Sequence, residues 1–317
     1  MSTAPEWRPD VLGEGFEAVT IELPPDDEGS VTATLVRGPA PRERERGSVL
    51  YLHGYNDYFF HADLARWYAE RGWAFFALDL RKHGRSLLAH QTPNFCRSLE
   101  DFDPDLDAAA AIIAEEHAGP LLVVAHSTGG LIAPLWVARR RGSGVVGMVL
   151  NSPFLDFRQP PAEAAVLAPV IKAVARHHAT AVFPAGMAGR YGDSIHTSRF
   201  GEWEYDLAWK PLASFPIRFG WLAAVAAGHA SVRAGLGLTI PVLAMSSTRT
   251  VAERAPVPDL MRGDAILNAD RIARRATRLG SAVTVVRVAE GMHDLFLSRP
   301  AARAEAYAAM GRWLDAL

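Results

Sequence analysis

Six short segments of the chain are continuously apolar, and they constrain its fold more than any other feature. Strands buried on both faces have such uninterrupted runs, whereas strands with one face in water alternate apolar and polar residues. We therefore expect central strands of a largely parallel sheet. The segments are SVLYLH (48–53), AFFALDL (74–80), LLVVAH (121–126), VVGMVLNS (145–152), PVLAMSS (241–247) and VTVVRVA (283–289).

Segments of helical character separate these strands. Several carry Asp or Asn near the start and end at Gly, which is the usual capping asymmetry of helices. They cover residues 61–72, 103–119, 128–142, 268–280 and 299–317. Two β-rich segments, 16–23 and 31–38, flank the turn sequence PPDDEGS and predict an antiparallel hairpin. The pattern predicts the α/β class, with a mostly parallel eight-stranded sheet and helices on both faces.

One region interrupts the alternation of strands and helices. Residues 154–238 contain no buried-strand pattern, and prolines separate helical pieces from the aromatic-rich stretch GEWEYDLAWKPLASFPIRFGW (201–221). We expect an inserted, mainly helical cap over 154–238, which we name the cap segment. The α/β core would then consist of residues 1–153 and 239–317.

Charge and composition exclude several classes of protein. The formal net charge is −2, and the 33 basic and 35 acidic side chains are interspersed, which argues against a nucleic-acid partner. Apolar runs fall short of the roughly 18 residues that a membrane span needs, so stable membrane insertion is not expected. The first residues lack a signal-peptide pattern, and Cys96 is the only cysteine. We expect a soluble, cytoplasmic protein, whose oligomeric state the sequence does not define.

A serine turn follows the segment 121–126. Ligands of open α/β sheets bind beyond the carboxyl ends of the strands, and AHSTGG (125–130) lies at such an end. A serine nucleophile needs a tight strand-to-helix turn with small neighbours. Ala125 stands where the GxSxG pattern has glycine, but it is small. Ser127 is therefore a candidate nucleophile, although a serine turn also serves as a plain helix cap.

Other strand ends supply possible partners for Ser127. HGYND (53–57) predicts a sharp turn, and the amides of Tyr55 and Thr128 are candidate donors to an oxyanion. His293 follows the last strand and is the candidate base, while the neighbouring Asp294 is expected to cap a helix. Asp264 is the best candidate for the acid that orients the imidazole. The alternatives for this acid are Asp259, Glu253 and Asp270.

Several charged residues near these strand ends have expected structural roles. His53 and His126 flank the candidate oxyanion groups and are expected to support them. In DLRKHGRS (79–86), the side chains of Asp79, Arg81 and Arg85 are expected to hold the loop by charge-assisted hydrogen bonds. The sequence has no glycine-rich nucleotide motif after a strand and no histidine spacing typical of zinc sites. We therefore expect no cofactor and no metal.

With Ser, Asp and His in that order, the chain resembles the α/β-hydrolase superfamily. More narrowly, it resembles the serine-hydrolase branch of monoacylglycerol lipases, lysophospholipases and serine aminopeptidases. The motifs are HGYND, DLRKHGRS, AHSTGG, GDAIL and GMHD, spread over essentially the whole chain. The resemblance implies an α/β-hydrolase fold, a triad of Ser127, Asp264 and His293, and an oxyanion hole at Tyr55 and Thr128. The chain departs from the branch at Ala125 and at Lys82, where glycine is common.

The expected activity is hydrolysis of carboxylic esters through an acyl-enzyme on Ser127, with a small-molecule acyl ester as substrate. Trp203, Trp209 and Trp221 of the cap segment are expected to line an apolar acyl pocket. Three alternatives remain open. They are an aminopeptidase or amidase that holds a substrate amine with Glu202 or Glu204, an acyltransferase, and a ligand-binding protein that lacks catalysis.

Overall fold

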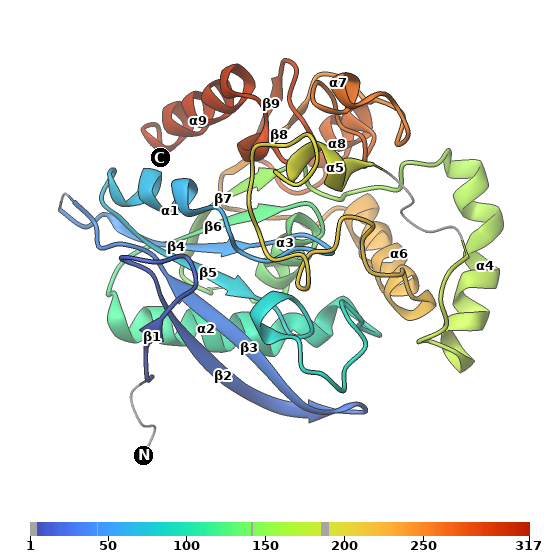
Figure 1. Cartoon of the computed structure of the whole chain (residues 1–317), viewed down its shortest axis with the longest axis horizontal. Helices are drawn as coiled ribbons and strands as arrows, with labels where there is room; N and C mark the ends of the chain where they lie inside the picture. Colours follow the sequence, from blue (N-terminus) through green and yellow to red (C-terminus); the bar gives the residue numbers. More distant parts are fainter. Residues whose placement is uncertain (1–4, 43, 141, 185–189) are drawn as a thin grey trace.

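The structure, a computed structural model, describes residues 5–42, 44–140, 142–184 and 190–317. One sheet contains all nine named strands of this part of the chain. The strands are β1 (Arg8–Pro9), β2 (Glu17–Asp26), β3 (Gly29–Arg37), β4 (Gly47–Leu52), β5 (Trp73–Asp79), β6 (Leu121–His126), β7 (Val145–Asn151), β8 (Val242–Ser247) and β9 (Val283–Val288). Their order across the sheet is β1-β2-β3-β5-β4-β6-β7-β8-β9 (Figure 1).

The strand pairing confirms the mostly parallel sheet. β2 and β3 form the expected antiparallel hairpin, and β3 pairs antiparallel with β5. From β5 through β4 to β9 all pairs are parallel. The two-residue β1 was not expected, because it is too short to carry a pattern. The expectation that residues 283–289 are buried on both faces was wrong, since β9 is an edge strand in which Val288 alone is fully buried.

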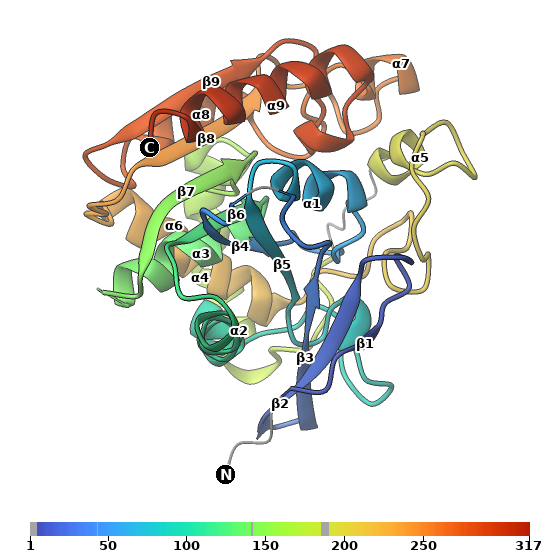
Figure 2. The same ribbon diagram turned by 90° about the vertical axis from the view of Figure 1, so that its left-hand side faces the viewer.

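Helices cover both faces of the sheet (Figure 2). They are α1 (Ala62–Ala69), α2 (Asp103–Glu116), α3 (Gly129–Arg139), α4 (Pro161–His177), α5 (Tyr191–Ile195), α6 (Phe219–Ala234), α7 (Val257–Leu260), α8 (Ala269–Ala276) and α9 (Pro300–Leu314), with short 3₁₀ turns η1 (Gly84–Ser86), η2 (Leu99–Phe102) and η3 (Leu295–Leu297). Side chains of α1 and α9 share one core cluster, whereas those of α2, α3, α6 and α8 share the other. None of the described helices is long and apolar enough to cross a bilayer.

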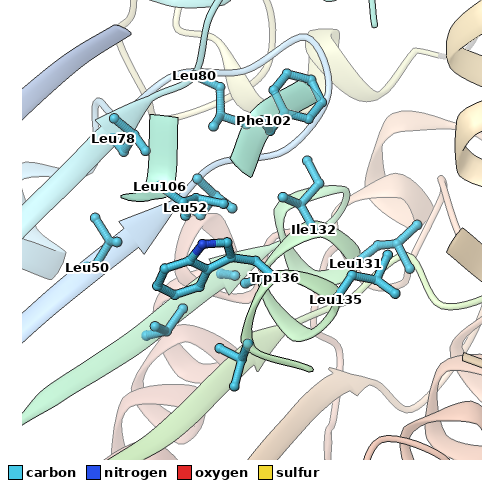
Figure 3. Packing of buried hydrophobic residues seen from close by; sticks show 14 of the residues in the cluster. Leu50, Leu52, Leu78, Leu80, Phe102, Leu106, Leu131, Ile132, Leu135 and Trp136 are labelled. Carbon is cyan, nitrogen blue, oxygen red and sulfur yellow. The ribbon is translucent and has the colours of Figure 1, made fainter. Parts of the chain in front are cut away.

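The core on the α3 side is built around Trp136. Figure 3 shows this indole between Leu50 and Leu52 of β4 and the side chains of α3 and α2. Trp136 is 2% exposed, and its Nε1–H donates to Asp107 Oδ1 at 2.8 Å. Truncation of such a side chain costs about 3–5 kcal/mol. The packing therefore fixes α3, and with it the serine turn that precedes this helix.

The cap segment connects β7 to β8 and contains α4, α5 and α6. Residues 185–189 of the segment lie outside the described residues. α4 and α6 lie side by side at one end of the molecule (Figure 1). α6 contributes Trp221, Leu222, Val225 and Val232 to the same core cluster as the sheet. This helix is therefore packed into the main core and does not form a separate one.

Candidate active site

The serine turn places Ser127 directly after β6 in a left-handed backbone conformation. Its φ is +50°, which costs an L-residue about 1–2 kcal/mol. A Cβ on Gly129 would lie 2.4 Å from the carbonyl oxygen of His53 and 2.7 Å from that of Leu52. Glycine is therefore required for α3 to begin so close to the end of β4. The buried Ala125, in contrast, is accommodated inside β6.

Substitution of Gly129 by alanine is expected to lower the free energy of unfolding by about 3 kcal/mol. The new methyl group would meet backbone carbonyl oxygens, which cannot rotate away as a side chain can. Urea denaturation would measure the loss. Gly311→Ala in α9 is the matched control, because its Cβ would make an ordinary 3.6 Å contact with Trp67. If both variants were as stable as the parent, the close approach at Gly129 would be refuted.

Ser127, His293 and Asp264 form a hydrogen-bonded chain. Ser127 Oγ lies 3.0 Å from His293 Nε2, and His293 Nδ1 lies 3.1 Å from Asp264 Oδ2. A neutral imidazole with its hydrogen on Nδ1 donates to the carboxylate and accepts from the hydroxyl. All three residues are buried, with Ser127 7% and His293 3% exposed. The arrangement has the geometry that nucleophile activation by a base requires.

Asp264 reaches this position through a loop that returns to the end of β8. Val251 N donates to Asp264 O at 2.9 Å, and Asp264 N donates to Arg249 O at 3.0 Å. Residues 252–263 thus form an excursion, and Asp264 pairs in parallel with Thr250, in the chain that follows β8. Its Oδ1 accepts from two backbone amides, those of Ile266 and Leu267. The fully buried carboxylate is therefore held in place before it meets the imidazole.

The three alternative acids do not meet His293. Asp259 lies 3.4 Å from Arg249, and Asp270 Oδ1 accepts from Arg287 at 2.9 Å. Glu253 is half exposed on its side chain and lies 3.8 Å from Arg158. Among these four described residues, Asp264 alone makes a hydrogen bond with the imidazole.

Two backbone amides near Ser127 are available to a ligand oxygen. Within the described residues, neither Tyr55 N nor Thr128 N donates to a backbone carbonyl. The chain bearing Tyr55 approaches the serine closely, since a Cβ on Gly54 would lie 3.0 Å from Ser127 Cβ. Thr128 precedes α3, where the helix dipole adds positive potential. These amides are suited to stabilise an oxyanion on an atom bonded to Ser127 Oγ.

A second buried polar group lies behind His293. Asp294 caps η3, as expected, because its Oδ1 accepts from Phe296 N at 2.9 Å, and it also accepts from Asn151 Nδ2 at 2.7 Å. Its Oδ2 lies 3.6 Å from His61 Nε2 and 3.9 Å from His126 Nε2. Burial would raise the pKa of Asp294, but the two histidines and the amide outweigh burial and lower the pKa. Burial lowers the pKa of His126 to about 4.

The residues with expected structural roles make extensive bonds. His53 accepts from Leu80 N at its Nε2 and lies 2.7 Å from Gly54 O through its Nδ1. Arg85 donates to Asp79 and Asp10, and Arg81 donates to Asp105. Lys82 takes φ of +62° and pairs with Asp26 and Glu28 of the hairpin turn. The lysine thus occupies the left-handed conformation that glycine would take.

The three tryptophans of the expected pocket lie in different surroundings. Trp221 packs against Tyr55 with ring centroids 4.4 Å apart, and it stacks on Phe154. Trp203 donates to Leu297 O and lies under Arg303, while Trp209 contacts Tyr58 and Arg85. Of these three tryptophans, Trp221 alone packs against a residue of the candidate site, Tyr55.

A surface groove of about 700 Å³ lies elsewhere. It is lined by residues such as Pro9, Phe16 and Phe75 and contains none of the three hydrogen-bonded residues Ser127, His293 and Asp264. We therefore do not assign this groove to the substrate.

Sequence reasoning missed several residues that shape the site. Tyr191 of α5 packs its ring edge against His293 at 5.6 Å, and its hydroxyl accepts from Asp294 N. Asn151, at the end of β7, accepts from Ser127 N through its carbonyl oxygen, and Phe154 N donates to Ser127 O. Asn151 and Phe154 follow an apolar strand, so the rule of strand ends would have found them. Tyr191 lies in a stretch without periodicity and gives no such indication.

An arginine joins the start of the cap segment to the loop that carries Asp264. Arg158 Nη1 donates to Ala265 O at 2.8 Å, and its Nη2 donates to Val251 O at 2.7 Å. These two carbonyls lie on either side of the excursion that ends at Asp264. The guanidinium therefore closes the base of that loop.

Comparison with known proteins identifies the family of this chain. The sequence matches the family model described as serine aminopeptidase, S33, over residues 43–299, a span that contains Tyr55, Ser127, Asp264 and His293. The chain belongs to the serine aminopeptidase S33 family. The resemblance to this group of α/β hydrolases, expected from the motifs, is confirmed. No curated protein sequence matches the chain.

Solved structures similar to this family member are α/β hydrolases over nearly their whole length. A carboxyl esterase from Bacillus coagulans shares 16% identity with a TM-score of 0.67, covering 94% of this chain and 98% of that chain. A monoglyceride lipase from Saccharomyces cerevisiae shares 15% sequence identity with a TM-score of 0.64, and the match covers 99% of this chain and 97% of that chain. A monoacylglycerol lipase from Paleococcus ferrophilus shares 20% sequence identity with a TM-score of 0.62, and the match covers 88% of this chain and 98% of that chain. At these identities the likeness confirms the fold.

Proposed function

We propose that this chain is a serine hydrolase that cleaves carboxylic esters of acyl or lipid-like type through an acyl-enzyme on Ser127. The observation that carries the proposal is the chain of contacts at 3.0 Å and 3.1 Å from Ser127 Oγ through His293 to Asp264. A hydroxyl needs this kind of adjacent, oriented base to act as a nucleophile at neutral pH.

In the proposed mechanism, His293 Nε2 takes the proton of Ser127 while Oγ attacks the ester carbonyl. The negative oxygen that forms is stabilised by the amides of Tyr55 and Thr128. Asp264 stabilises the imidazolium, which then protonates the leaving alcohol. Water, deprotonated by the same imidazole, attacks the acyl-enzyme and releases the acid. The chemistry requires no further group beyond these residues.

The surroundings of Ser127 favour an apolar acyl group. Tyr55, Phe154 and Trp221 form an aromatic cluster whose member Phe154 bonds to the serine backbone. Aromatic side chains beside a few polar groups are typical of sites for apolar small molecules. Similar structures are those of a carboxyl esterase and a monoacylglycerol lipase, which supports the same substrate class. We propose that the cap segment, through Trp221, contributes to acyl-chain choice.

An aminopeptidase activity is the second candidate, because the family model carries that description. Such an enzyme needs a carboxylate that binds the substrate's amine. Glu202 and Glu204 are exposed. The buried carboxylates of Asp57 and Asp294 already face Lys210 and two histidines, respectively. Among these four, Asp294 Oδ2 is buried without a hydrogen bond, but it faces two histidines at 3.6 Å and 3.9 Å, so we favour esters over peptides.

A substrate panel tests the proposal. We expect turnover of p-nitrophenyl esters to increase from acetyl to medium acyl chains, with measurable hydrolysis of a monoacylglycerol and a lysophospholipid. Amino-acid p-nitroanilides should be poor substrates. A preference confined to acetyl would contradict an extended apolar site, and faster cleavage of the anilides would favour the aminopeptidase. Product analysis with added alcohol would reveal an acyltransferase.

Labelling with a fluorophosphonate separates an enzyme from a ligand-binding protein with the same fold. An activated Ser127 forms a covalent adduct with the probe. Peptide mapping should locate this adduct on the peptide that contains Ser127. A chain that folds but does not label would contradict the acyl-enzyme.

A further inference from the structure

Residues 54–58, which we name the oxyanion loop, are bonded to the cap segment along their length. Each of Tyr55, Asn56, Asp57 and Tyr58 has a polar contact with a cap residue. The contacts are Tyr55 Oη to Pro216 O at 3.0 Å, Asn56 Nδ2 to Pro211 O at 3.1 Å, Phe215 N to Asn56 Oδ1 at 3.1 Å, Lys210 Nζ to Asp57 Oδ1 at 2.7 Å and Asp206 N to Tyr58 Oη at 2.7 Å. The loop is therefore held from outside as well as by its own chain.

The ion pair between Lys210 and Asp57 is the buried centre of these contacts. Lys210 is 9% exposed and Asp57 is 2% exposed. The ammonium also donates to Asn56 O at 3.4 Å, and the second oxygen of Asp57 accepts from Gly54 N at 3.3 Å. Burial would raise the pKa of Asp57, but the positive charge of Lys210 and the smaller contributions of His126, His61 and His53 together outweigh burial and lower the pKa. One cation thus ties both ends of the short turn around Tyr55.

The backbone of the oxyanion loop needs such support. Asn56 adopts φ of +47°, which is unfavourable for an L-residue. Without Lys210, Asp57 would be a buried carboxylate with no cationic partner, and the loop would shift to hydrate it. A shift of about 1 Å in a group that acts on the transition state can cost about 100-fold in rate. The amide of Tyr55, next to Asn56, would move with the loop.

We propose that Lys210 is a positioning residue for the reaction at Ser127, which holds the Tyr55 amide in place through Asp57. Lys210 does not touch the substrate. It couples the position of the cap segment to the oxyanion hole. The Tyr55 amide is then in place only when residues 205–216 are packed against the oxyanion loop. This inference rests on the proposed function of Ser127, Tyr55 and Thr128.

The test uses Lys210→Met, which keeps the length of the side chain and removes its charge. The matched control is Lys82→Met, since Lys82 is also a buried lysine, 2% exposed, with carboxylates at 2.6 Å and 2.7 Å. Within the described residues, its ammonium makes ion pairs with Asp26 and Glu28 and none with the oxyanion loop. If Lys210→Met does not fold, the double variant Lys210→Met with Asp57→Asn removes both charges and is assayed in its place. Circular dichroism and thermal unfolding establish that each variant is folded.

The expected result is a fall in kcat of about 10- to 100-fold, with KM for a p-nitrophenyl ester changed by less than about threefold. The inhibition constant of a trifluoromethyl ketone, whose adduct with serine carries an oxyanion, should rise in proportion to the loss of kcat/KM. Lys82→Met should lose stability but keep its kcat. A merely structural lysine would not change the affinity for the ketone selectively.

Two kinds of result overturn the inference. A folded Lys210 variant with kcat within twofold of the parent enzyme, or an equal loss of kcat in Lys82→Met, would show that the ion pair does not position the amide. In that case loss of hydrolysis in Ser127→Ala would leave the proposed function standing. Hydrolysis that survives Ser127→Ala would overturn the proposed function and this inference together.

Discussion

Replacing Ser127 with alanine is expected to lower ester hydrolysis by about 10⁴- to 10⁶-fold while the fold remains intact. The change removes one oxygen and keeps the Cβ, so the left-handed turn and the packing of α3 are unaffected. His293→Ala should cause a loss of similar size. The double variant should be little worse than either single one, because the two residues act as a unit. Steady-state kinetics with a p-nitrophenyl ester would measure all three.

Ser152 offers a matched control for this substitution. It follows the neighbouring strand β7, is fully buried and also has a positive φ, +45°. Its Oγ has no hydrogen-bond partner among the described residues. Ser152→Ala should therefore retain most of the activity. Equal losses in the two serine variants would indicate general damage to the site and contradict the special role of Ser127.

The folded chain is expected to lose stability steeply between about pH 6.5 and pH 4. Burial lowers the pKa of four histidines, to about 3 for His83, to about 4 for His126 and His229, and below the ordinary range for His61. In the unfolded chain these rings bind protons below about pH 6.5, whereas the folded chain excludes the protons until the pH is much lower. Stability is therefore fully present above pH 6.5 and falls as the pH falls.

The size of this effect follows from proton linkage. Each proton taken up only by the unfolded chain is worth about 1.4 kcal/mol per pH unit, so the three histidines with a pKa of about 3 to 4 give about 4 kcal/mol per pH unit near pH 5.5. Asp105, whose pKa burial raises to about 6, offsets about 1 kcal/mol per pH unit of this slope, because the folded chain binds that proton before the unfolded chain does. Urea denaturation at several pH values would measure the slope. His229→Gln should reduce the slope by about 1 kcal/mol per pH unit, since one buried neutral histidine is lost. His177→Gln, at an exposed position, is the control; a flat profile in the parent protein would contradict the prediction.

The apolar runs predicted the strands because burial on both faces leaves a local trace in each segment. They did not predict the edge position of β9, because a valine-rich segment has the same sequence pattern in a central strand as in a strand at the edge of the sheet. The serine and the histidine were found because each follows such a run. Local pattern does not separate Asp264 from Asp259, because the deciding contacts, between Asp264 and residues Arg249 and Val251, are made across an irregular loop.

The contacts of the cap segment could not have been predicted from local pattern. Lys210 and Asp57 are 153 positions apart in the sequence, and neither lies in a helix or strand. Their neighbours in sequence carry no periodicity that would orient them. The pairing arises only when the aromatic stretch 201–221 folds back over the strand ends. The proposed positioning of the Tyr55 amide therefore depends on tertiary contacts that the motifs do not contain.

Arg158 has a consequence for the way this protein can be altered. Its guanidinium bonds the entrance of the cap segment to Val251 and Ala265, at the base of the acid-bearing loop. A chimera that imports a foreign cap from residue 154 onward would remove those bonds and release the loop. A transplanted cap segment therefore has to be exchanged together with residues 249–265. Substrate selectivity and the position of Asp264 would then change together and not independently.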